Sequence, residues 1–373
     1  MTAAGSRVVR VVRCADYATG LPPALARLLD ACPLLAPAAV SGRRVLVKPN
    51  LLTDRTPEEA VTTHPALLRL VVRHLVAAGA RVTVGDSPAS AANLASVLAK
   101  TGVGAVCREE GVPFVPFEGE GARHFERDGF SFDLARPVVE ADLVVSLPKV
   151  KSHSLTKLTA AVKNLYGAIP GYGKTTLHRL HPKPRDFGRL LRTVWRELPP
   201  VVSLADAVVG MEGQGPANGR PVRLGFLAMS ADAFALDLAL CRILGLRAET
   251  VPYLRGEAAN HAPDIQGDSV AVPSFDVPAG SYLLDLLPAG LMRIAAKVLW
   301  VRPTFDAARC TACGRCVRAC PVSALSQPTS AGPALRRQVC VGCACCHEVC
   351  PAGAIRMTPS PVLRLARAFK GLA

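Results

Sequence analysis

The sequence predicts an α/β fold, a mostly parallel sheet with helices on both faces, followed by a C-terminal two-cluster ferredoxin-like domain. Two observations lead to this prediction. Short apolar stretches alternate with stretches of helical periodicity through the first 300 residues, which is the pattern of parallel strands joined by helices. Eight cysteines then follow between Cys310 and Cys350, in two runs that have the same internal spacing. This is a pattern of iron–sulfur ligation.

The two cysteine runs share one spacing, Cys-x-x-Cys-x-x-Cys-x-x-x-Cys-Pro, as an internal repeat would. In bacterial ferredoxins the first three cysteines of such a run bind one 4Fe–4S cluster and the fourth binds the other. A zinc site or a disulfide framework fits less well, because zinc sites usually pair two separated Cys-x-x-Cys hooks. Cys345 is a ninth cysteine in this stretch and occupies no ligand position. The predicted ligand sets are Cys310, Cys313, Cys316 and Cys350 for one cluster, and Cys320, Cys340, Cys343 and Cys346 for the other.

The chain of 373 residues divides into three predicted parts. Residues 1–300 form the α/β domain, 301–360 the ferredoxin-like domain, and 361–373 a basic amphipathic tail. No run of 18 apolar residues occurs, and the N-terminus has no apolar signal region, so we expect no membrane span and no secretion. Cluster ligation also requires free thiolates, which favours a reducing compartment. We therefore expect a cytoplasmic protein.

The formal net charge of +15 raises the question of nucleic-acid binding. From residue 301 onward, ten lysines and arginines face only two acidic residues. Each oxidised cubane with its four thiolates carries a charge of about −2, so part of this excess compensates the clusters. The remainder suits a redox partner with an acidic surface, or an anionic membrane. Aromatic residues do not interleave with the basic ones, and we expect no nucleic-acid partner.

The first half of the α/β domain begins with a predicted strand over 7–13. Thr63 is a suitable N-cap, with Pro65 in the first turn of a helix that runs to Gly79. Further predicted strands lie at 44–47, 81–84 and 113–117, and further helices at 22–35 and 90–100.

The second half contains a continuous apolar strand over 142–147. The preceding residues 118–135 are rich in glycine and charge and are expected to form a surface excursion. A helix is predicted to begin at Asp232 and to reach Gly245. The other predicted elements are a helix that carries 163–167 and strands at 201–204 and 223–229.

Polar residues follow four of the predicted strands at the point where each ends. In parallel sheets, ligands bind outside the carboxyl ends of the strands, so this edge is the expected site. Lysines there suit a carboxylate or phosphate, and the imidazole of His153 suits proton transfer. The predicted catalytic residues are His153, Lys149, Lys151, Asp86 and Asp206. The predicted substrate-binding residues are Lys48, Asn50, His64, Ser87, Lys163 and Asn164.

Two nucleotide-binding motifs fail on inspection. Gly173-Lys174-Thr175 resembles the end of a phosphate-binding loop, but the earlier glycine that this loop requires is replaced by Ala168. No G-x-G-x-x-G follows a strand, which removes the usual dinucleotide fingerprint. A flavin stays open, because many flavin sites lack a short motif. A further metal, held by His64 and His153 with the two strand-end aspartates, also stays open but lacks tight ligand spacing.

Two helices with basic faces are predicted near the clusters. One spans 282–300, with Arg293 and Lys297 four residues apart. The other forms the tail, where apolar positions recur at helical spacing opposite three basic residues. Such helices either dock on their own protein or lie on anionic membranes. Peripheral membrane contact is therefore an alternative.

Several phrases of the sequence together carry a specific resemblance. The chain resembles the domain of unknown function 362 family, in the form with a C-terminal pair of ferredoxin motifs. The resemblance covers about 40–358 and implies an iron–sulfur protein with an α/β domain, but it supplies no reaction. Family members often have an aromatic residue where this chain has Ala344. The phrases are VKPN at 47–50, TTHP at 62–65, GDSP at 85–88, LPKVKSH at 147–153, VKNLYG at 162–167, DAVVGMEG at 206–213 and CACCHE at 343–348.

Three functions are compatible with these features. The leading one is an oxidoreductase in which the ferredoxin module exchanges electrons with a small anionic substrate at the strand ends. The second is a non-enzymatic electron carrier whose α/β domain recognises a partner. The third is a non-redox ligase or isomerase with structural clusters. Converging lysines and histidines argue against a pure carrier, and two clusters in series argue against a structural role.

Overall fold

The computed structural model describes residues 7–89, 92–272, 274–278, 300–326 and 332–362. The predicted helix over 282–300 and the basic tail lie outside these residues, apart from 300, 361 and 362. Both therefore stay predictions, as do the exact domain boundaries.

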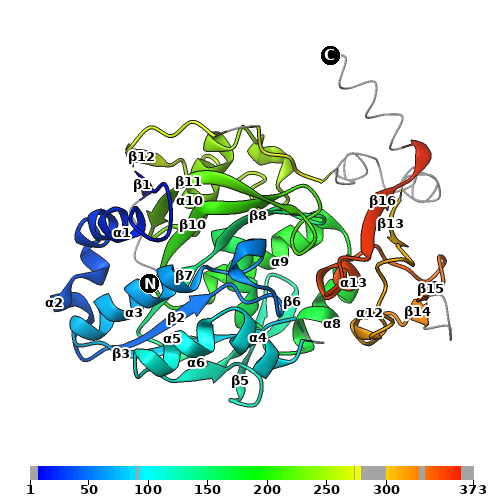
Figure 1. Ribbon diagram of the computed structural model, residues 1–373, viewed down its shortest axis with the longest axis horizontal. Coiled ribbons are helices and arrows are strands. Elements are labelled where there is room, and N and C mark those ends of the chain that lie inside the picture. The colour runs from blue at the N-terminus through cyan, green and yellow to red at the C-terminus, as the bar shows by residue number, and fades with distance from the viewer. Residues whose placement is uncertain (1–6, 90–91, 273, 279–299, 327–331, 363–373) are drawn as a thin grey trace.

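Within the described residues, ten strands form one sheet at the centre of the α/β domain (Figure 1). They are β1 (Val8–Arg13), β2 (Arg44–Pro49), β3 (Arg81–Asp86), β4 (Phe114–Pro116), β7 (Leu143–Leu147), β8 (Lys149–His153), β9 (Lys157–Thr159), β10 (Val201–Glu212), β11 (Arg220–Ser230) and β12 (Asp264–Gly267). The order along the sheet is β12-β1-β11-β10-β7-β2-β3-β4, with β8 pairing to β10 and β9 to β8. Only β1–β11, β10–β11 and β8–β9 are antiparallel among the described pairs, so the mostly parallel sheet is confirmed.

Helices cover both faces of the sheet, as expected. Strand side chains alternate between the faces, so that Val45 and Val47 enter one apolar core and Leu46 enters the other. The first core is covered by α1 (Leu21–Asp30), η1 (Pro33–Leu35), α2 (Pro37–Val40), α3 (Pro65–Ala77), α4 (Leu94–Lys100) and α5 (Val103–Glu109). The second is covered by α6 (Arg136–Val139), α7 (Ala161–Leu165), η3 (Tyr166–Ala168), α8 (Gly173–Leu180), α9 (Pro184–Arg196) and α10 (Ala233–Ile243). Two further 3₁₀ turns are η2 (Pro57–Glu59) and η4 (Ala248–Thr250).

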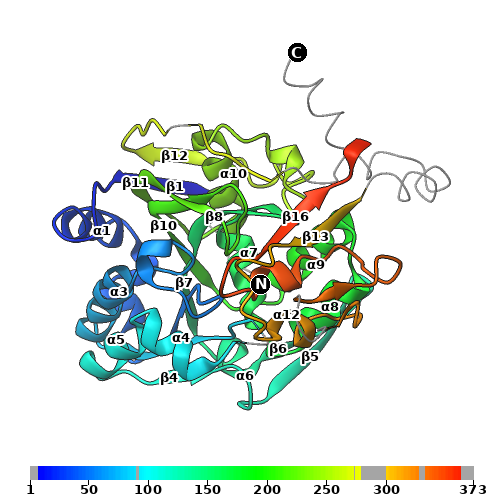
Figure 2. The same ribbon diagram turned by 45° about the vertical axis from the view of Figure 1, so that its right-hand side comes forward.

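The ferredoxin-like module lies at one side of the α/β domain, drawn in orange and red in Figures 1 and 2. Its outer strands β13 (Val301–Phe305) and β16 (Ile355–Pro359) pair antiparallel and bracket both cysteine runs. Each run leads into one short helix, α12 (Arg315–Arg318) or α13 (Cys345–Glu348). A small ladder joins β14 (Leu325–Ser326) to β15 (Ala334–Leu335). The helices α12 and α13 contact one another, as an internal repeat predicts.

The segment 118–135 differs from its prediction as a surface excursion. It forms the hairpin β5 (Ala122–Arg127) and β6 (Phe130–Ala135). Phe130, Phe132 and Leu134 are buried in the core, and exposed Ser131 and Asp133 alternate with them. This period of two is a strand signal that the glycine-rich composition concealed.

Four element boundaries also differ from the prediction. The segment after β7 was expected to be a polar strand end, but it continues as the buried strand β8, and β10 runs through Asp206 to Glu212. The N-cap of α3 is His64, whose Nδ1 accepts the Ala66 N–H at 3.2 Å. Thr63 instead joins two strand ends, since its Oγ1 donates to Leu147 O at 2.6 Å and accepts from the Asn50 N–H at 2.8 Å. The helix predicted over 22–35 ends at Asp30, shortly before Pro33.

Candidate functional site

The eight cysteines of the two runs line two separate small cavities of the ferredoxin-like module. One cavity is lined by Cys310, Cys313, Cys316 and Cys350. The other is lined by Cys320, Cys340, Cys343 and Cys346. Each cavity thus gathers three cysteines of one run and the fourth of the other, which is the ligand pattern of paired cubane clusters. Four thiols in apolar surroundings fit the donor set that a 4Fe–4S cluster requires.

An equivalent backbone hydrogen bond to a cysteine sulfur occurs in each of the two cysteine cavities. The Ala324 N–H donates to Cys320 Sγ at 3.1 Å, and the Ala354 N–H donates to Cys350 Sγ at 3.3 Å. Hydrogen bonds to the ligand sulfurs are one means by which a protein tunes cluster potential. In the described part of the chain, no three His, Cys, Asp or Glu side chains converge on one metal ion. Cubane ligands are spaced more widely than this, because each binds a different iron.

The two cysteine sets differ in their access to solvent. Cys313 of the first set is exposed, whereas Cys343 and Cys346 of the second set are buried. The first cavity therefore reaches the surface of the module. Cys350 of the first set is also buried, and Cys320 and Cys340 of the second set are half-buried.

A pocket of about 90 Å³ lies between the strand ends of the α/β domain and helix α13. It brings together residues that the sequence analysis selected from four separate segments: Lys48, Asn50, Asp86, Ser87, Lys151, His153, Lys163 and Asn164. Helix α8 adds Lys174 and His178, and β9 adds Thr159. The ferredoxin-like module closes the pocket with Ala319, Cys345, Glu348 and Val349. The pocket is therefore built by both modules.

Helix α7 is held in place by a buried acid and brings Lys163 and Asn164 to the pocket. Asp237 accepts the N–H groups of Ala161 at 2.7 Å and Val162 at 3.0 Å. These are the first residues of α7, where backbone donors lack partners within the helix. Burial raises the pKa of Asp237 to about 7. The Asn164 amide nitrogen in turn donates to Ser146 Oγ at 2.9 Å, which orients its side chain.

Gly167 lies against the Lys48–Asp86 ion pair. Lys48 Nζ is 2.6 Å from Asp86 Oδ1, and both side chains are buried. A Cβ on residue 167 would come within 2.6 Å of Lys48 Nζ and 2.8 Å of Asp86 Oδ1. The absence of a side chain is therefore required at this position, and it leaves the ion pair facing the pocket.

Two further lysines of the pocket have no carboxylate at ion-pair distance within the described residues. Lys151 Nζ donates to Val61 O at 2.7 Å, and Lys163 Nζ lies over the Tyr166 and Phe187 rings at 4.7 and 5.5 Å. Burial lowers the pKa of both lysines, that of Lys151 to about 7. With Lys48 and Lys174, these are the four lysines of the pocket, which has only two carboxylates. The excess positive charge suits an anion.

His153 is aligned by the backbone and faces the ferredoxin-like module. Its Nδ1 accepts the N–H groups of Leu155 at 3.0 Å and Thr156 at 3.3 Å, so the hydrogen of the neutral ring is on Nε2. Nε2 lies 3.2 Å from Glu348 Oε1. Burial lowers the pKa of His153 to about 4, so the ring is neutral near pH 7. The pair connects a strand end to α13, which carries cluster ligands.

Several side-chain atoms that line the pocket are buried without a hydrogen-bond partner in the described residues. They are Asn50 Oδ1, Thr159 Oγ1, Asn164 Oδ1, His178 Nδ1 and Glu348 Oε1. The Glu348 oxygen counts among them because its contact with His153 is close but not aligned as a hydrogen bond. Buried polar atoms are normally paired. Their concentration in one pocket is the property expected of a ligand site.

Lys149, Asp206 and His64 do not reach the pocket, contrary to the expected convergence. They form a closed network with Tyr17, in which Lys149 Nζ is 2.7 Å from Asp206 Oδ2. The Tyr17 hydroxyl donates to Asp206 Oδ1 at 2.6 Å and accepts from Lys149 at 2.9 Å. The His64 ring stacks on Tyr17 at 3.6 Å between centroids. Lys149 is directly opposite Asp206 in the β8–β10 register, and buried charges require such a partner.

This separation changes two expectations about His153 and metals. Glu348, and neither Asp86 nor Asp206, is the carboxylate beside His153. The four residues considered for a further metal are also divided, with His153 and Asp86 in the pocket and the other two in the closed network.

The sequence analysis missed Glu348, Lys174, His178, Thr159 and the position of Cys345. Lys174 was considered only within a failed phosphate-loop motif, and its Nζ donates to Ser87 O at 2.7 Å. Cys345 and Glu348 lie among cluster ligands in the sequence, and nothing local shows that they face another domain. The only signal in the sequence for this contact was Cys345, which occupies no cluster-ligand position.

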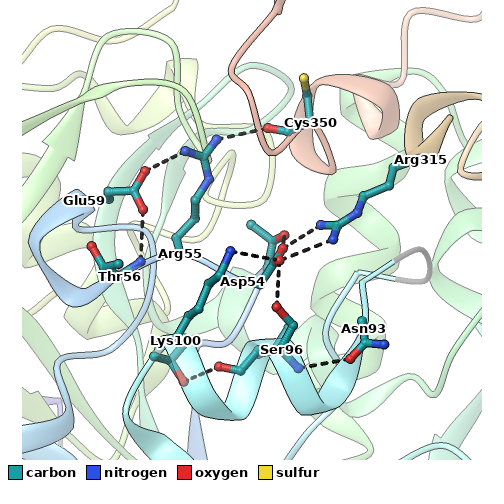
Figure 3. Close-up of polar contacts among 12 residues, drawn as sticks. Asp54, Arg55, Thr56, Glu59, Asn93, Ser96, Lys100, Arg315 and Cys350 are labelled. Carbon is teal, nitrogen blue, oxygen red and sulfur yellow. Dashed lines mark hydrogen bonds and ion pairs between the residues drawn. The ribbon is translucent and has the colours of Figure 1, made fainter. Parts of the chain in front are cut away.

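Two neighbouring residues of the α/β domain, Asp54 and Arg55, attach the ferredoxin-like module (Figure 3). Asp54 receives both arms of Arg315, at 2.6 and 3.3 Å, and the Ser96 hydroxyl at 3.0 Å. Arg55 donates to the backbone oxygen of Cys350 at 3.0 Å. Burial alone would raise the pKa of Asp54, but the bonds from Arg315 hold it well below its usual range. These contacts keep α13 in place as a wall of the pocket.

Comparisons with known proteins agree with this architecture. The model for the Domain of unknown function (DUF362) matches residues 45–242, and that for a 4Fe-4S binding domain matches 303–326. A Synechocystis sp. protein named thylakoid-associated protein sll1697 is 34% identical over 252 residues, which cover 67% of this chain and 78% of that protein. The chain belongs to the DUF362 family. The DUF362 match contains every predicted site residue of the α/β domain. The second match shows that the chain has an iron–sulfur cluster-binding motif.

Two solved structures are distantly similar to this DUF362 protein. The lactate racemase apoprotein from Thermoanaerobacterium thermosaccharolyticum is 13% identical with a TM-score of 0.43, and covers 65% of this chain and 57% of its own. A Thermotoga maritima protein is 12% identical with a TM-score of 0.34, and covers 56% of this chain and 55% of its own. The DUF362 chain thus spans little more than half of either structure. In the part of the chain that the structure describes, no helix has the length and apolar character to cross a membrane.

Proposed function

We propose that this protein is an iron–sulfur oxidoreductase that binds two 4Fe–4S clusters and acts on a small anionic substrate in the pocket. One observation carries the proposal. Cys345 and Glu348 line the pocket, while Cys343 and Cys346, their neighbours in the chain, line the second cysteine cavity. A substrate in the pocket would therefore lie against the peptide that ligates the second cluster. When bound, the clusters supply or accept single electrons.

The exposure of the cysteines supports a direction for the route between partner and pocket. Cys313 places the first ligand set at the surface, and Cys345 joins the second set to the pocket. Exposed Arg309, Arg318 and Arg356 belong to the same module. Such a surface favours a redox partner with an acidic face. We propose exchange with that partner at the first ligand set.

The residues of the pocket divide between anion binding and proton transfer. Lys151 and Lys163, which lack carboxylate partners, are proposed to bind the anion, with Lys48, Asn50, Ser87 and Asn164 around it. The His153–Glu348 pair is proposed to exchange a proton with the substrate. A two-electron reduction then adds two electrons from the partner protein and two protons from water to the substrate, and the oxidation reverses this balance. Lys149, Asp206 and His64 have no proposed part in the reaction.

The same pocket argues against the two alternative functions, an electron carrier and a non-redox ligase or isomerase. A pure electron carrier has no need of a pocket lined by four lysines, and a ligase or isomerase with structural clusters has no need of two clusters. A flavin stays an alternative. Cytoplasmic location and peripheral membrane contact stay predictions, although the name of the Synechocystis relative refers to thylakoids.

Cluster content is the first test. Anaerobically isolated protein should contain about eight iron and about eight acid-labile sulfide per chain. Cys320→Ser and Cys350→Ser should each impair one cluster, whereas the matched control Cys345→Ser should leave the stoichiometry intact. About four iron in fully loaded wild-type protein, or zinc in its place, would contradict the proposal.

Turnover tests the reaction. Small molecules that co-purify with the anaerobic protein, identified by mass spectrometry, supply candidate substrates. His153→Ala should keep both clusters and their reduction by dithionite but lose turnover. Thr176→Ala, on the α8 surface and outside the pocket lining, is the control. Undiminished turnover in His153→Ala would overturn the assignment of the proton pair.

A further inference from the structure

The unpartnered polar atoms of the pocket are mostly hydrogen-bond acceptors. Oxygens of Asn50, Asn164 and Thr159 are buried there without a hydrogen-bond partner in the described residues, and the Glu348 oxygen has only His153 Nε2 close by, at 3.2 Å. The Asn164 amide nitrogen donates to Ser146 Oγ at 2.9 Å, and its Oδ1 has no hydrogen-bond partner in the described residues. An anion satisfies lysines and can accept from the Thr159 hydroxyl, but it offers no hydrogen to the amide oxygens of Asn50 and Asn164. A ligand that carries donors as well as negative charge satisfies both kinds of group.

The charge of the pocket decides which donors fit. Ammonium groups are strong donors, but buried Lys151 and half-buried Lys163 line the pocket without a carboxylate at ion-pair distance in the described part of the chain. A further cation beside them would be repelled in this low-dielectric setting. Hydroxyl groups donate without charge. They can satisfy amide, hydroxyl and carboxylate oxygens while the anionic end of the same molecule meets the lysines.

The volume limits the size of the ligand. A cavity needs roughly 10–15 Å³ of this measure for each water-sized position. The pocket volume of about 90 Å³ therefore corresponds to on the order of six to nine such positions. A compact molecule with a similar number of non-hydrogen atoms fills it, whereas nucleotides and flavins are far larger.

From these observations we propose that the substrate is a small anion that carries two or more hydroxyl groups. The acceptors come from four parts of the chain around the pocket: Asn50 after β2, Thr159 on β9, Asn164 on α7 and Glu348 on α13. Two or more hydroxyls satisfy acceptors on several elements better than one hydroxyl does. This inference rests on the proposed function, because it names the substrate class of the same pocket.

Matched ligand pairs test the proposal on full-length, cluster-loaded protein under anaerobic conditions. Tartrate differs from succinate, and glycerate from propionate, only by two hydroxyl groups. Glycerol 3-phosphate against propyl phosphate repeats the comparison with a different anion and shows which anion is preferred. Calorimetric titration should give at least tenfold tighter binding for the hydroxylated member of a pair that binds.

Two variants separate the hydroxyl contacts from the charge contacts. Thr159→Val keeps the side-chain shape and should reduce the preference for the hydroxylated member by about tenfold, with little change for its partner. Lys163→Met should weaken both members of a pair about equally. Ser203→Ala is the matched control, because Ser203 Oγ is also buried and unpartnered but lies outside the pocket. It should change neither affinity.

The outcomes are distinct for the two proposals. Equal affinity within each pair, with weakening by Lys163→Met, would overturn the hydroxylated substrate and leave the anion site in place. Binding of no probe, or binding that Lys163→Met leaves unchanged, would overturn the anion site and the inference that depends on it. Cluster content and dithionite reduction, measured on the same samples, exclude loss of folding as the cause.

Discussion

Two groups of buried lysines and acids lie beside the same strand, β8, and they differ in how completely their polar atoms are paired. In the closed network, Lys149, Asp206 and Tyr17 satisfy one another at 2.6 to 2.9 Å. In the pocket, the hydrogen-bond partner of Lys151 among the described residues is a backbone oxygen, and several oxygens around it have no partner there. Lys149 and Lys151 are only two residues apart on the same strand. Residue type and strand position therefore do not reveal which lysine is paired within the fold and which faces the pocket.

The difference lies in what each lysine faces. The register of β8 and β10 places Asp206 opposite Lys149 but Met211 opposite Lys151. A buried ion pair with further hydrogen bonds serves the fold, because removal of either partner leaves an uncompensated charge. A buried lysine without a carboxylate is costly to the fold. The proposed anion would offset this cost when it binds.

The largest expected effect breaks the closed network. Lys149→Met should lower the free energy of unfolding by about 3–5 kcal/mol, because Asp206 is left buried without its cation. Lys151→Met removes a lysine without a carboxylate partner and should leave stability unchanged or slightly higher. Anaerobic urea unfolding of the two variants measures the contrast. Equal destabilisation would show that the two lysines do not differ in this way.

Gly167→Ala tests the pocket, as opposed to the closed network. The new methyl group would displace Lys48 from Asp86 and occupy the pocket, so the affinity for an anion should fall by about tenfold or more. The expected loss of stability is about 1–3 kcal/mol, as for other overpacked sites. Gly173→Ala, on α8 and outside the pocket lining, is the control for an added methyl group. Unchanged affinity in Gly167→Ala would exclude this wall as part of the binding site.

The pH dependence of anion binding sharpens the contrast further. Burial lowers the pKa of Lys151 to about 7; Glu348 and Asp86 oppose this effect, while Lys163 and Lys149 add to it. The protonated form binds the anion, so affinity should be constant below pH 7 and fall by up to about tenfold per unit above it. Burial also lowers the pKa of Lys174, to about 8, which extends the decline. Lys151→Arg should remove the first step, since arginine stays charged. A flat profile in wild-type protein would contradict the role of Lys151.

The smallest expected effect concerns the attachment between the modules. Arg315→Gln removes the bidentate contact with Asp54, but Asp54 keeps Ser96 and has Lys100 at 3.6 Å. We expect the cluster module to lose about 1 kcal/mol of apparent stability, followed by the visible absorption of the clusters in urea. Arg318→Gln, an exposed residue on the same helix, is the control. A loss above about 3 kcal/mol would place this contact among the principal stabilising interactions.

Much of the fold followed from the sequence because the signals are local. Alternating strand and helix patterns predict the parallel sheet, and equal cysteine spacing predicts the paired ferredoxin halves. The pocket residues at 48–50, 86–87 and 151–153 were found because parallel strands bring their carboxyl ends to one edge. The contact of Glu348 with His153 was not predictable, because it depends on how two modules dock. The pairing of Lys149 with Asp206 depends on strand register, which local patterns do not specify across distant strands.

Helix α13 has a consequence for how the protein matures in the cell. It supplies the wall of the pocket with Cys345 and Glu348, it is followed by Val349 in the same wall, and it contains the predicted ligand Cys346. The conformation of so short a segment depends on its surroundings, and metal ligation orders such peptides as they fold. Under the proposed function, a newly made chain without its clusters would lack an ordered wall on this side of the pocket. Cluster insertion would then complete the substrate site and the electron route in one step.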